Sequence, residues 1–586
     1  MKDAPRSEAA KHGERVRLAG PFAVGLAVML FLAAALVGVV LDAPALARWF
    51  SHPALGEGGT RMAGRSAEWT QSAVPLALML AASIILVLWR TGSSRHDGSA
   101  TAVDGRATRA TEDRAMRTEW LALVAIVLVA ALVRIDRAFE SLWYDEIAAF
   151  MDYAQHGPGP IVATWFSPAN HPLQSLLSWC SFTTIGAVNE LSLRLPSLVV
   201  ALLTVLATWW MARPIAGRRA ALLAAACTAV APAVVLGSVE ARGYSIMMLA
   251  GAMQTGLAWR AVDRERARQD ALWCWIAYAA VASLGVWAHF TTVLVPVAHG
   301  VIAASLLWRG DRRVGWRWLA ALVLSAACTL ALLAPMMPWI LERRAELAAL
   351  DGNEPTLWSR EGLAILGTWG GAWLWWPSIL GGAVALVGVV QCWRRDAPHR
   401  LAVALIVLPF LLALVIPMAG SWIYARFVSF ALPGAALAWG LGLDRLLAWR
   451  RSVGLAAVAV LIASWLLVLV DLPPKQPLRD LLAIAAQEPG PVIVVGLPDE
   501  VTRFYAEPMG IDARYAKPYG ADLAELLEAE PTARVVMLYP RAMPSSVQGA
   551  LDAASMVRTH ALPGWADWGA GSVELHARRG GAPPAP

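Results

Sequence analysis

Cysteine and charge are both scarce in this sequence, and the familiar metal and nucleotide motifs are lacking. Only 16% of the 586 residues are charged. The cysteines show neither a CxxC pair nor a metal-ligand spacing, so we expect them to pack as small apolar side chains. They are Cys180, Cys227, Cys274, Cys328 and Cys392. Glycine-rich phosphate cradles are also missing, which argues against a soluble nucleotide as substrate.

Long apolar runs are what the sequence has in abundance. Hydrophobic residues make up 58% of the chain and the mean hydropathy is +0.53, well above the values of a soluble domain. We therefore expect a mainly α-helical, polytopic membrane protein with about thirteen spans. The expected spans are residues 21–41, 74–89, 121–135, 196–212, 219–237, 243–259, 271–289, 291–308, 317–340, 378–393, 400–418, 427–447 and 453–470.

Arginine clusters between the apolar runs set the expected topology. The clusters from Arg213 to Arg451 are assigned to the cytoplasm, because short cytoplasmic loops are rich in Lys and Arg. This assignment places the N-terminus inside and the C-terminus outside. Residues 173–188 are apolar, but a crossing there would move the next arginine clusters outside, so we expect a helix lying at the outer interface. By the same reasoning, residues 362–376 are expected to be interfacial or re-entrant.

Changes in composition divide the chain into domains. Residues 1–89 are expected to form a cytoplasmic tail and a two-span hairpin, and residues 90–118 a flexible cytoplasmic linker. Residues 119–470 are expected to form the membrane core, with a large external loop at 136–195. Residues 471–586 are expected to fold outside the membrane as a small soluble α/β domain. Its expected strands are Val492–Val495, Arg534–Leu538 and Ser572–His576.

Ionisable and aromatic residues from distant stretches converge on the outer surface in this topology. Asp145 and Glu146 follow an apolar run and are flanked by aromatic residues of the kind that anchor at a membrane interface. The other members are His171, Glu240, Arg242, Tyr244, His289, Tyr424 and Arg426. Each has an ordinary explanation alone, such as a solvated acid, a helix-capping histidine or a snorkelling arginine. Together they favour a site, because charges at a bilayer boundary are costly unless they are paired or used.

The residue types of this set indicate its chemistry. Arginine suits phosphate through paired, permanently charged contacts, and a carboxylate can deprotonate an acceptor hydroxyl or amine. Apolar grooves between helices suit a lipid tail. The set therefore predicts transfer of a group from a lipid phosphate to an acceptor outside the membrane. We assign catalysis to Asp145 and Glu146 and substrate binding to the other members. No tight metal-ligand spacing is present, so we assign no metal ligand and leave a divalent metal open.

An ordered set of short motifs within about residues 120–450 resembles a known group of enzymes. It is similar to bacterial members of the protein O-mannosyltransferase and aminoarabinose lipid A transferase superfamily, the C-type glycosyltransferases that use polyprenyl-phosphate sugars. The matching pieces are Trp143-Tyr144-Asp145-Glu146, Asn170-His171-Pro172-Leu173, Arg194-Leu195-Pro196-Ser197, Glu240-Ala241-Arg242-Gly243-Tyr244-Ser245, His289-Phe290, and Ala425-Arg426-Phe427 followed by Leu432-Pro433-Gly434.

The resemblance implies an inverting glycosyltransferase of the bacterial inner membrane that moves a hexosyl or pentosyl group on the extracytoplasmic side. Asp145 would be the base that acts on the acceptor, and Glu146 and His171 would line the sugar pocket. Arg242 and Arg426 would hold the lipid phosphate and stabilise it as leaving group. The resemblance also implies interfacial helices in the first external loop.

Three positions depart from the family pattern. A single proline, Pro172, follows the histidine where two are frequent. Gly243 stands where an aromatic residue or methionine is common, and Phe427 where tyrosine is frequent. The resemblance also implies that His289 faces the cavity of the sugar and the lipid phosphate, where some members of the family place a metal. These departures bear on substrate details, and the acceptor, whether protein, lipid or polysaccharide, is left open.

Competing functions make different demands on the sequence. A transporter or flippase of lipid-linked sugars should carry ionisable residues near the middle of the membrane and internal repeats. Here the candidate residues gather at one surface and no repeat is visible, which favours the enzyme. A transferase acting on a lipid diphosphate and a non-catalytic scaffold that displays the C-terminal domain are further alternatives. The scaffold hypothesis predicts that Asp145 is dispensable.

Overall fold

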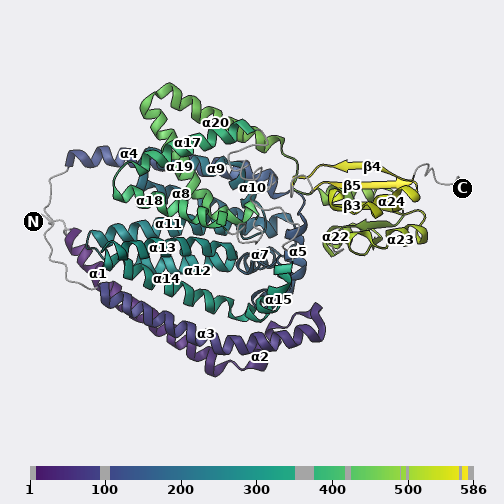
Figure 1. The fold of residues 1–586 in the computed structure, drawn as a ribbon, viewed down its shortest axis with the longest axis horizontal. Helices are drawn as coiled ribbons and strands as arrows, with labels where there is room; N and C mark the ends of the chain where they lie inside the picture. Colours follow the sequence, from purple (N-terminus) through teal and green to yellow (C-terminus); the bar gives the residue numbers. More distant parts are fainter. Residues whose placement is uncertain are drawn as a thin grey trace, which may run out of the picture.

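The structure is a computed structural model in which a bundle of long helices carries a small separate domain at one end (Figure 1). It describes residues 8–92, 106–349, 375–415, 424–488, 490–496, 500–565 and 571–578. Within these ranges nine helices are long and apolar enough to cross a membrane, or ten if one bent pair counts as a single span. The expected polytopic helical architecture is confirmed.

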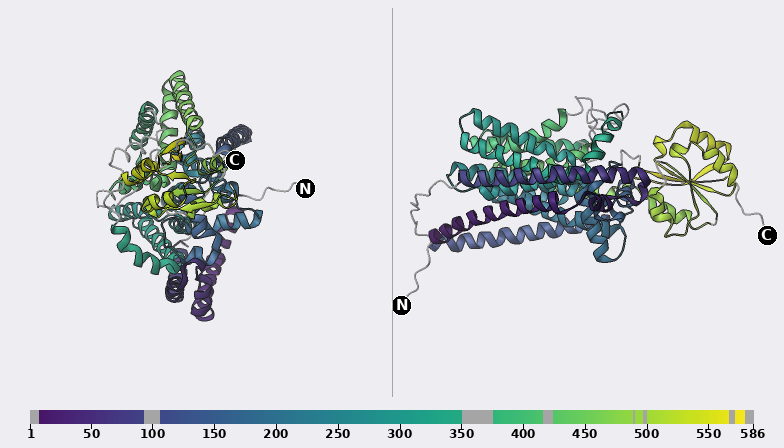
Figure 2. Two further views of the ribbon diagram at one scale, coloured as in Figure 1. Left: turned by 90° about the vertical axis from the view of Figure 1, so that its right-hand side faces the viewer. Right: turned by 90° about the horizontal axis from the view of Figure 1, so that it is seen from below.

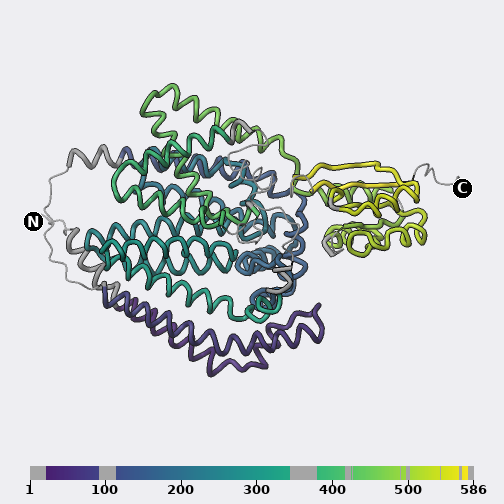
Figure 3. The backbone as a smooth tube through the Cα atoms, in the orientation of Figure 1, coloured from purple at the N-terminus to yellow at the C-terminus, as the bar shows by residue number. Residues whose placement is uncertain are grey.

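An N-terminal hairpin runs along one edge of the bundle (Figure 3). Its helices α1 (Glu8–Ala35) and α3 (Gly56–Gly92) contact each other along their length. A π-helical turn, Leu36–Val40, and the short helix α2 (Ala43–Phe50) join them. Helix α3 is much longer than the expected span at 74–89, because its polar first half continues the helix beyond the apolar run.

The expected linker at 90–118 is helical over much of its length. Helix α4 spans Arg106–Ala138, so residues 106–118 form its first turns. This stretch is rich in Ala and Arg, which favour helix, and it contains neither glycine nor proline. The remaining linker residues at 93–105 lie outside the described residues.

The other expected spans fall on helices of the membrane core, but 219–237 and 317–340 are each divided between two consecutive helices, and residues 416–418 lie outside the described residues. These helices are α8 (Glu190–Ala216), α9 (Arg218–Val230), α10 (Pro232–Ser238), α11 (Tyr244–Arg266), α12 (Leu272–Ala288), α13 (Leu294–Trp308), α14 (Arg312–Leu333), α15 (Met337–Ala349), α17 (Trp375–Trp393), α18 (Ala397–Val415), α19 (Leu432–Trp449) and α20 (Arg451–Asp471). Among the described residues nine or ten helices meet the length and composition of a membrane span, compared with the expected count of about thirteen. Helix α12 and the apolar part of α17 are too short to qualify, and α11 ends in a run of charged residues.

The expected external loop at 136–195 consists of short helices at one end of the bundle (Figure 1). They are α5 (Tyr144–Asp152), the 3-10 turn Ala154–His156, α6 (Pro158–Ala163) and α7 (Pro172–Ile185). Helix α7 covers the segment expected at the interface, and it is not among the candidate spans. Nearly all of the second expected interfacial segment, 362–376, lies outside the described residues.

The C-terminal domain is a five-stranded mixed sheet of order β2-β1-β3-β5-β4. Its strands are β1 (Val492–Val495), β2 (Ala513–Tyr515), β3 (Arg534–Leu538), β4 (Met556–Leu562) and β5 (Val573–Arg578). The strands expected from the sequence are present as β1, β3 and β5. Strand β2 was missed because it has three residues, and β4 because its central residues Arg558, Thr559 and His560 are polar and exposed.

Helices cover both faces of this sheet (Figure 2). Helices α23 (Leu523–Ala529) and α24 (Ser545–Ala553) pack on one face through apolar side chains. Helices α21 (Leu478–Ala485) and α22 (Glu500–Ala506) lie on the other face, in one apolar cluster that also includes α5. The domain is therefore packed directly against the external loop.

Candidate active site

Asp145 lies between two arginines that come from separate loops. It is the second residue of α5, and its side chain is 22% exposed. Nη2 of Arg242, from the turn between α10 and α11, lies 3.5 Å from Oδ2 of Asp145. Nη2 of Arg426, from the 3-10 turn before α19, lies 3.9 Å from the same oxygen. A carboxylate and two permanent cations thus share a partly open site.

Glu146 is directed into the protein instead. Its side chain is fully buried, and Nη2 of Arg194 lies 2.5 Å from Oε2. Oε1 accepts from Nε of Arg194 at 2.8 Å and from the main-chain N–H of Ala241 at 2.7 Å. Burial alone would raise the pKa of Glu146, but the charge and hydrogen bonds of Arg194 outweigh burial and lower it. Glu146 therefore ties α5 to the turn that carries Arg242.

His171, Tyr244 and His289 form a cluster of rings beside this pair. The centroid of the His171 ring lies 4.8 Å from that of His289 and 5.7 Å from that of Tyr244. Nδ1 of His171 lies 3.0 Å from the carbonyl oxygen of Ala288 and 3.3 Å from the main-chain nitrogen of Gly243, so this ring nitrogen is engaged inside the protein. Burial and the charges of nearby arginines hold the pKa of His171 well below its usual value and lower that of His289 to about 3.

Gly243 makes room for the His171 ring. A Cβ at this position would lie 2.6 Å from Nδ1 of His171 and 2.3 Å from the carbonyl oxygen of Ala288. The glycine that departs from the family pattern is thus in contact with the histidine of another motif. Larger residues cannot occupy position 243 while His171 keeps this place.

Lys475 is a site residue that the sequence analysis missed. It follows the last helix of the membrane core, and its Nζ lies 2.7 Å from Oε1 of the buried Glu240. The same Nζ lies 3.3 Å from the centroid of the Trp143 ring. Burial raises the pKa of Glu240, although Lys475 opposes that shift. The one available signal was that no lysine occurs between Lys11 and Lys475.

Several buried polar atoms in this region have no hydrogen-bond partner among the described residues. The donors are Trp143 Nε1, Arg242 Nε, Tyr244 OH and Gln476 Nε2, and the acceptor is Glu240 Oε2. Unsatisfied buried groups are costly, so native proteins rarely keep them without a reason. A cluster rich in donors suits a ligand rich in acceptor oxygens, such as a phosphate or a sugar.

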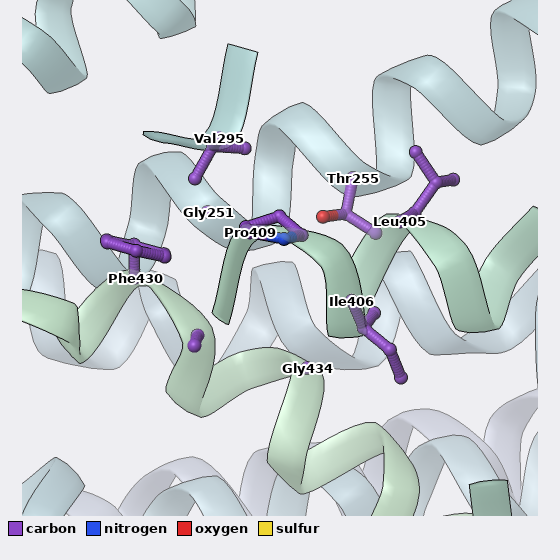
Figure 4. A pocket seen from close by; sticks show the side chains of 9 residues that line it. Gly251, Thr255, Val295, Leu405, Ile406, Pro409, Phe430 and Gly434 are labelled. Atoms are coloured by element: carbon purple, nitrogen blue, oxygen red, sulfur yellow. The ribbon is translucent and has the colours of Figure 1, made fainter. Parts of the chain in front are cut away.

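Tyr424 and Phe427 enclose Arg426 with their rings. The Arg426 guanidinium carbon lies 4.3 Å from the centroid of Tyr424 and 5.7 Å from that of Phe427. A small cavity of about 10 Å³, room for about one water molecule, lies between α11, α13, α18 and α19 (Figure 4). Its lining residues are Gly251, Thr255, Val295, Leu405, Ile406, Pro409, Phe430, Ala431 and Gly434. The lining is almost entirely apolar and includes Phe430, four positions after Arg426.

The residues around Asp145 do not make a metal centre in the part of the chain that the structure describes. No group of three His, Cys, Asp or Glu side chains is close enough there to hold a metal ion. His171 and His289 face each other, but one nitrogen of each is already engaged, with Ala288 and with Thr291. We therefore derive no step through a metal.

Comparisons with known proteins agree with this architecture. Residues 170–339 match the family model described as dolichyl-phosphate-mannose-protein mannosyltransferase. No curated protein matches the chain. The apo structure of ArnT from Cupriavidus metallidurans aligns with a TM-score of 0.50 and 14% identity over 79% of this chain and 98% of ArnT. This likeness shows a shared fold, the C-type architecture expected from the motifs.

Two further solved structures align more loosely. ArnT from Cupriavidus metallidurans bound to undecaprenyl phosphate gives a TM-score of 0.48 at 16% identity, over 80% of this chain and 100% of that one. The oligosaccharyltransferase AglB from Archaeoglobus fulgidus, in complex with an inhibitory peptide and a dolichol-phosphate, gives 0.46 at 12% identity. That alignment covers 72% of this chain and 69% of AglB.

Proposed function

We propose that this chain is a membrane glycosyltransferase that moves a sugar from a polyprenyl-phosphate donor to an acceptor on the extracytoplasmic face. The observation that carries the proposal is Asp145 placed against Arg242 and Arg426, beside buried hydrogen-bond donors that lack partners within the described ranges. A phosphate-linked sugar supplies the acceptor oxygens that these donors need. The match of residues 170–339 to a mannosyltransferase model supports the same class.

Asp145 is the proposed base. Its carboxylate takes the proton of the acceptor hydroxyl or amine as that atom forms a bond to the anomeric carbon of the sugar. The bond between this carbon and the phosphate oxygen breaks at the same time, and the lipid phosphate leaves with the electron pair. Arg242 and Arg426 stabilise the charge that develops on the phosphate. Because the acceptor attacks opposite the leaving group, the configuration at the anomeric carbon inverts.

The remaining residues receive supporting roles. His171 offers Nε2 to a sugar hydroxyl, and Tyr244 offers a hydroxyl that has no partner among the described residues. Tyr424 orients Arg426 by ring contact. Glu146, which was expected to take part in catalysis, is proposed to position Asp145 and Arg242, because both of its oxygens are engaged inside the protein.

The apolar side chains near Arg426 support a lipid donor. Those around the small cavity between α11, α13, α18 and α19 include Phe430, four positions after Arg426 (Figure 4). The proposed side of the membrane follows from the arginine-rich loops, which join the other ends of α8, α11 and α13. This places the external loop and residues 471–586 outside.

Turnover of a labelled donor tests the proposal. Membranes with and without the overexpressed chain are given a radiolabelled polyprenyl-phosphate sugar, and both transfer of label and release of lipid phosphate are measured. An Arg426→Ala variant should raise the donor KM strongly. If the donor is not consumed but labelled lipid-linked sugar crosses the bilayer of proteoliposomes, the chain is a transporter and the proposal is wrong.

A further inference from the structure

The helix that carries Asp145 is fastened at its first turn by the junction that leads into the C-terminal domain. The main-chain N–H of Tyr144, the first residue of α5, donates to Oε1 of Gln476 at 2.9 Å. Two residues earlier, the N–H of Leu142 donates to the hydroxyl of Tyr505 at 2.8 Å. The first N–H groups of a helix have no partner within the helix, so Gln476 supplies a partner that α5 lacks, while Tyr505 holds the residue before the N-cap.

Lys475 contacts Trp143, the residue between Leu142 and Tyr144. Its ammonium group lies over the ring of Trp143, which directly precedes α5, and also pairs with Glu240. Glu240 belongs to the same turn as Arg242. One lysine therefore fixes both the residue before the Asp145 helix and the turn that supplies an arginine to Asp145.

The side chains of this junction are buried. Gln476 is completely buried, Lys475 is 6% exposed and Tyr505 is 6% exposed. Arg479 adds a pair to Glu190 at 2.6 Å, and its main-chain N–H donates to the hydroxyl of Ser141 at 3.0 Å. An apolar cluster shared by α5, α21 and α22 lies beside these polar contacts.

We propose that Lys475 and Gln476 are positioning residues of the transferase site, so that docking of the C-terminal domain sets the place of Asp145. This inference rests on the proposed function and adds a part to it. Gln476 acts through the backbone of Tyr144, one residue from Asp145, and Lys475 acts through Trp143 and Glu240. A shift of about 1 Å in a catalytic group can cost on the order of a hundredfold in rate. The C-terminal domain is then required for turnover although it supplies no base.

Variants of the full-length chain test the Gln476 contact. Gln476→Met removes the acceptor of the Tyr144 N–H at nearly constant length, whereas Gln476→Glu keeps an acceptor oxygen. Gln548→Met is the matched control, because Gln548 is exposed in α24 and bonds only within that helix. We expect Gln476→Met to lower kcat on the order of tenfold to a hundredfold at an unchanged donor KM. Gln476→Glu should restore most of that loss.

Hydrogen exchange at the segment 141–150 is a second readout that does not depend on activity. Exchange should be faster in Gln476→Met than in the wild type and the control, and Gln476→Glu should slow it again. Unchanged exchange together with a kcat within about twofold of wild type would overturn the proposal. A fall in kcat without faster exchange would also overturn it, because Gln476 would then act on the substrate. If the wild type transfers no sugar, the proposed function fails while exchange still decides whether the junction holds α5.

A separate pair of variants tests the contact made by Lys475. Lys475→Met is paired with Lys517→Met, a lysine whose side chain is 70% exposed in the same domain. We expect kcat to fall in Lys475→Met and to stay unchanged in Lys517→Met. In the double variant Glu240→Gln/Lys475→Met no carboxylate is left uncompensated, so thermal stability should recover while kcat stays low. Recovery of kcat in the double variant would overturn the role of Lys475, because it would show that the lysine only neutralises Glu240.

Discussion

Arg242 and Asp145 stand 97 positions apart in the sequence, and the arginine contacts both the backbone and the side chain of the aspartate. Nη1 of Arg242 donates to the main-chain carbonyl of Asp145 at 3.3 Å, and Nη2 lies 3.5 Å from Oδ2. Nη1 also donates to the carbonyl of Ala169. A planar guanidinium that is only 4% exposed thus orients the carboxylate while it keeps its Nε without a partner among the described residues.

This geometry predicts that lysine cannot replace arginine at position 242. Lysine keeps the charge but loses the planar set of donors that contacts the backbone, the carboxylate and a phosphate together. Arg242→Lys should lower kcat/KM for the polyprenyl-phosphate donor on the order of tenfold to a hundredfold. The control is Arg218→Lys, which changes a paired arginine among the loops at the other end of the bundle. Equal activity of the two variants would contradict the role given to Arg242.

The two adjacent carboxylates should behave differently on truncation. Glu146→Ala leaves Arg194 charged and buried, so we expect a loss of about 3–5 kcal/mol in the free energy of unfolding. Asp145→Ala removes a longer contact, and the buried Arg242 keeps its hydrogen bonds to two main-chain carbonyls, so this variant should cost less, about 1 kcal/mol. Tryptophan fluorescence during unfolding measures both. A similar loss of unfolding free energy in both variants would show that the ion pair between Glu146 and Arg194 contributes no more to stability than the contacts of Asp145.

Gly243 should not tolerate a larger residue in this chain. Gly243→Met would push His171 away from Ala288, and we expect lower stability, by about 1–3 kcal/mol, together with loss of transfer. Gly237→Ala is the control, because a Cβ there meets its nearest neighbours at 3.7 Å, an ordinary contact. Thermal unfolding and turnover are measured side by side. A fully active Gly243→Met would mean that His171 need not stay where the structure places it.

Acid should destabilise the protein through its buried histidines. The pKa of His289 is lowered from 6.5 to about 3, and that of His171 is also lowered. Below pH 6.5 the unfolded chain binds protons that the folded chain does not bind, so stability is fully present above pH 6.5 and falls as pH drops. Each histidine contributes at most about 1.4 kcal/mol per pH unit.

The pH dependence of unfolding between pH 7 and pH 5 measures this effect. His289→Gln should make the fall shallower, whereas His560→Gln, at an exposed position in β4, should leave it unchanged. Parallel curves for the wild type and His289→Gln would contradict the burial of His289 in neutral form.

Some of this organisation could be predicted from the sequence because it depends on regular patterns. Apolar runs and arginine clusters place Asp145, Arg242 and Arg426 at one end of the bundle without any knowledge of packing. The different surroundings of Asp145 and Glu146 could not be predicted. Neighbouring residues on a helix point about 100° apart, and only the packed structure decides which one meets Arg194.

The contribution of the C-terminal junction could not be predicted from the sequence either. Lys475 and Gln476 follow two prolines in an irregular segment, where no periodicity indicates a direction for side chains. The contact between Gln476 and Tyr144 joins residues 332 positions apart.

Sugar transfer by an Asp145→Asn variant, with donor binding measured in the same preparation, tests the central claim most directly. The protein is purified in nanodiscs with a labelled polyprenyl-phosphate sugar, and Asp512→Asn serves as a control at an exposed aspartate. We predict that Asp145→Asn binds the donor like the wild type but loses transfer by on the order of 10²–10⁴, the range of general base catalysis. An Asp145→Asn variant that binds the donor and transfers sugar at the wild-type rate would contradict the account.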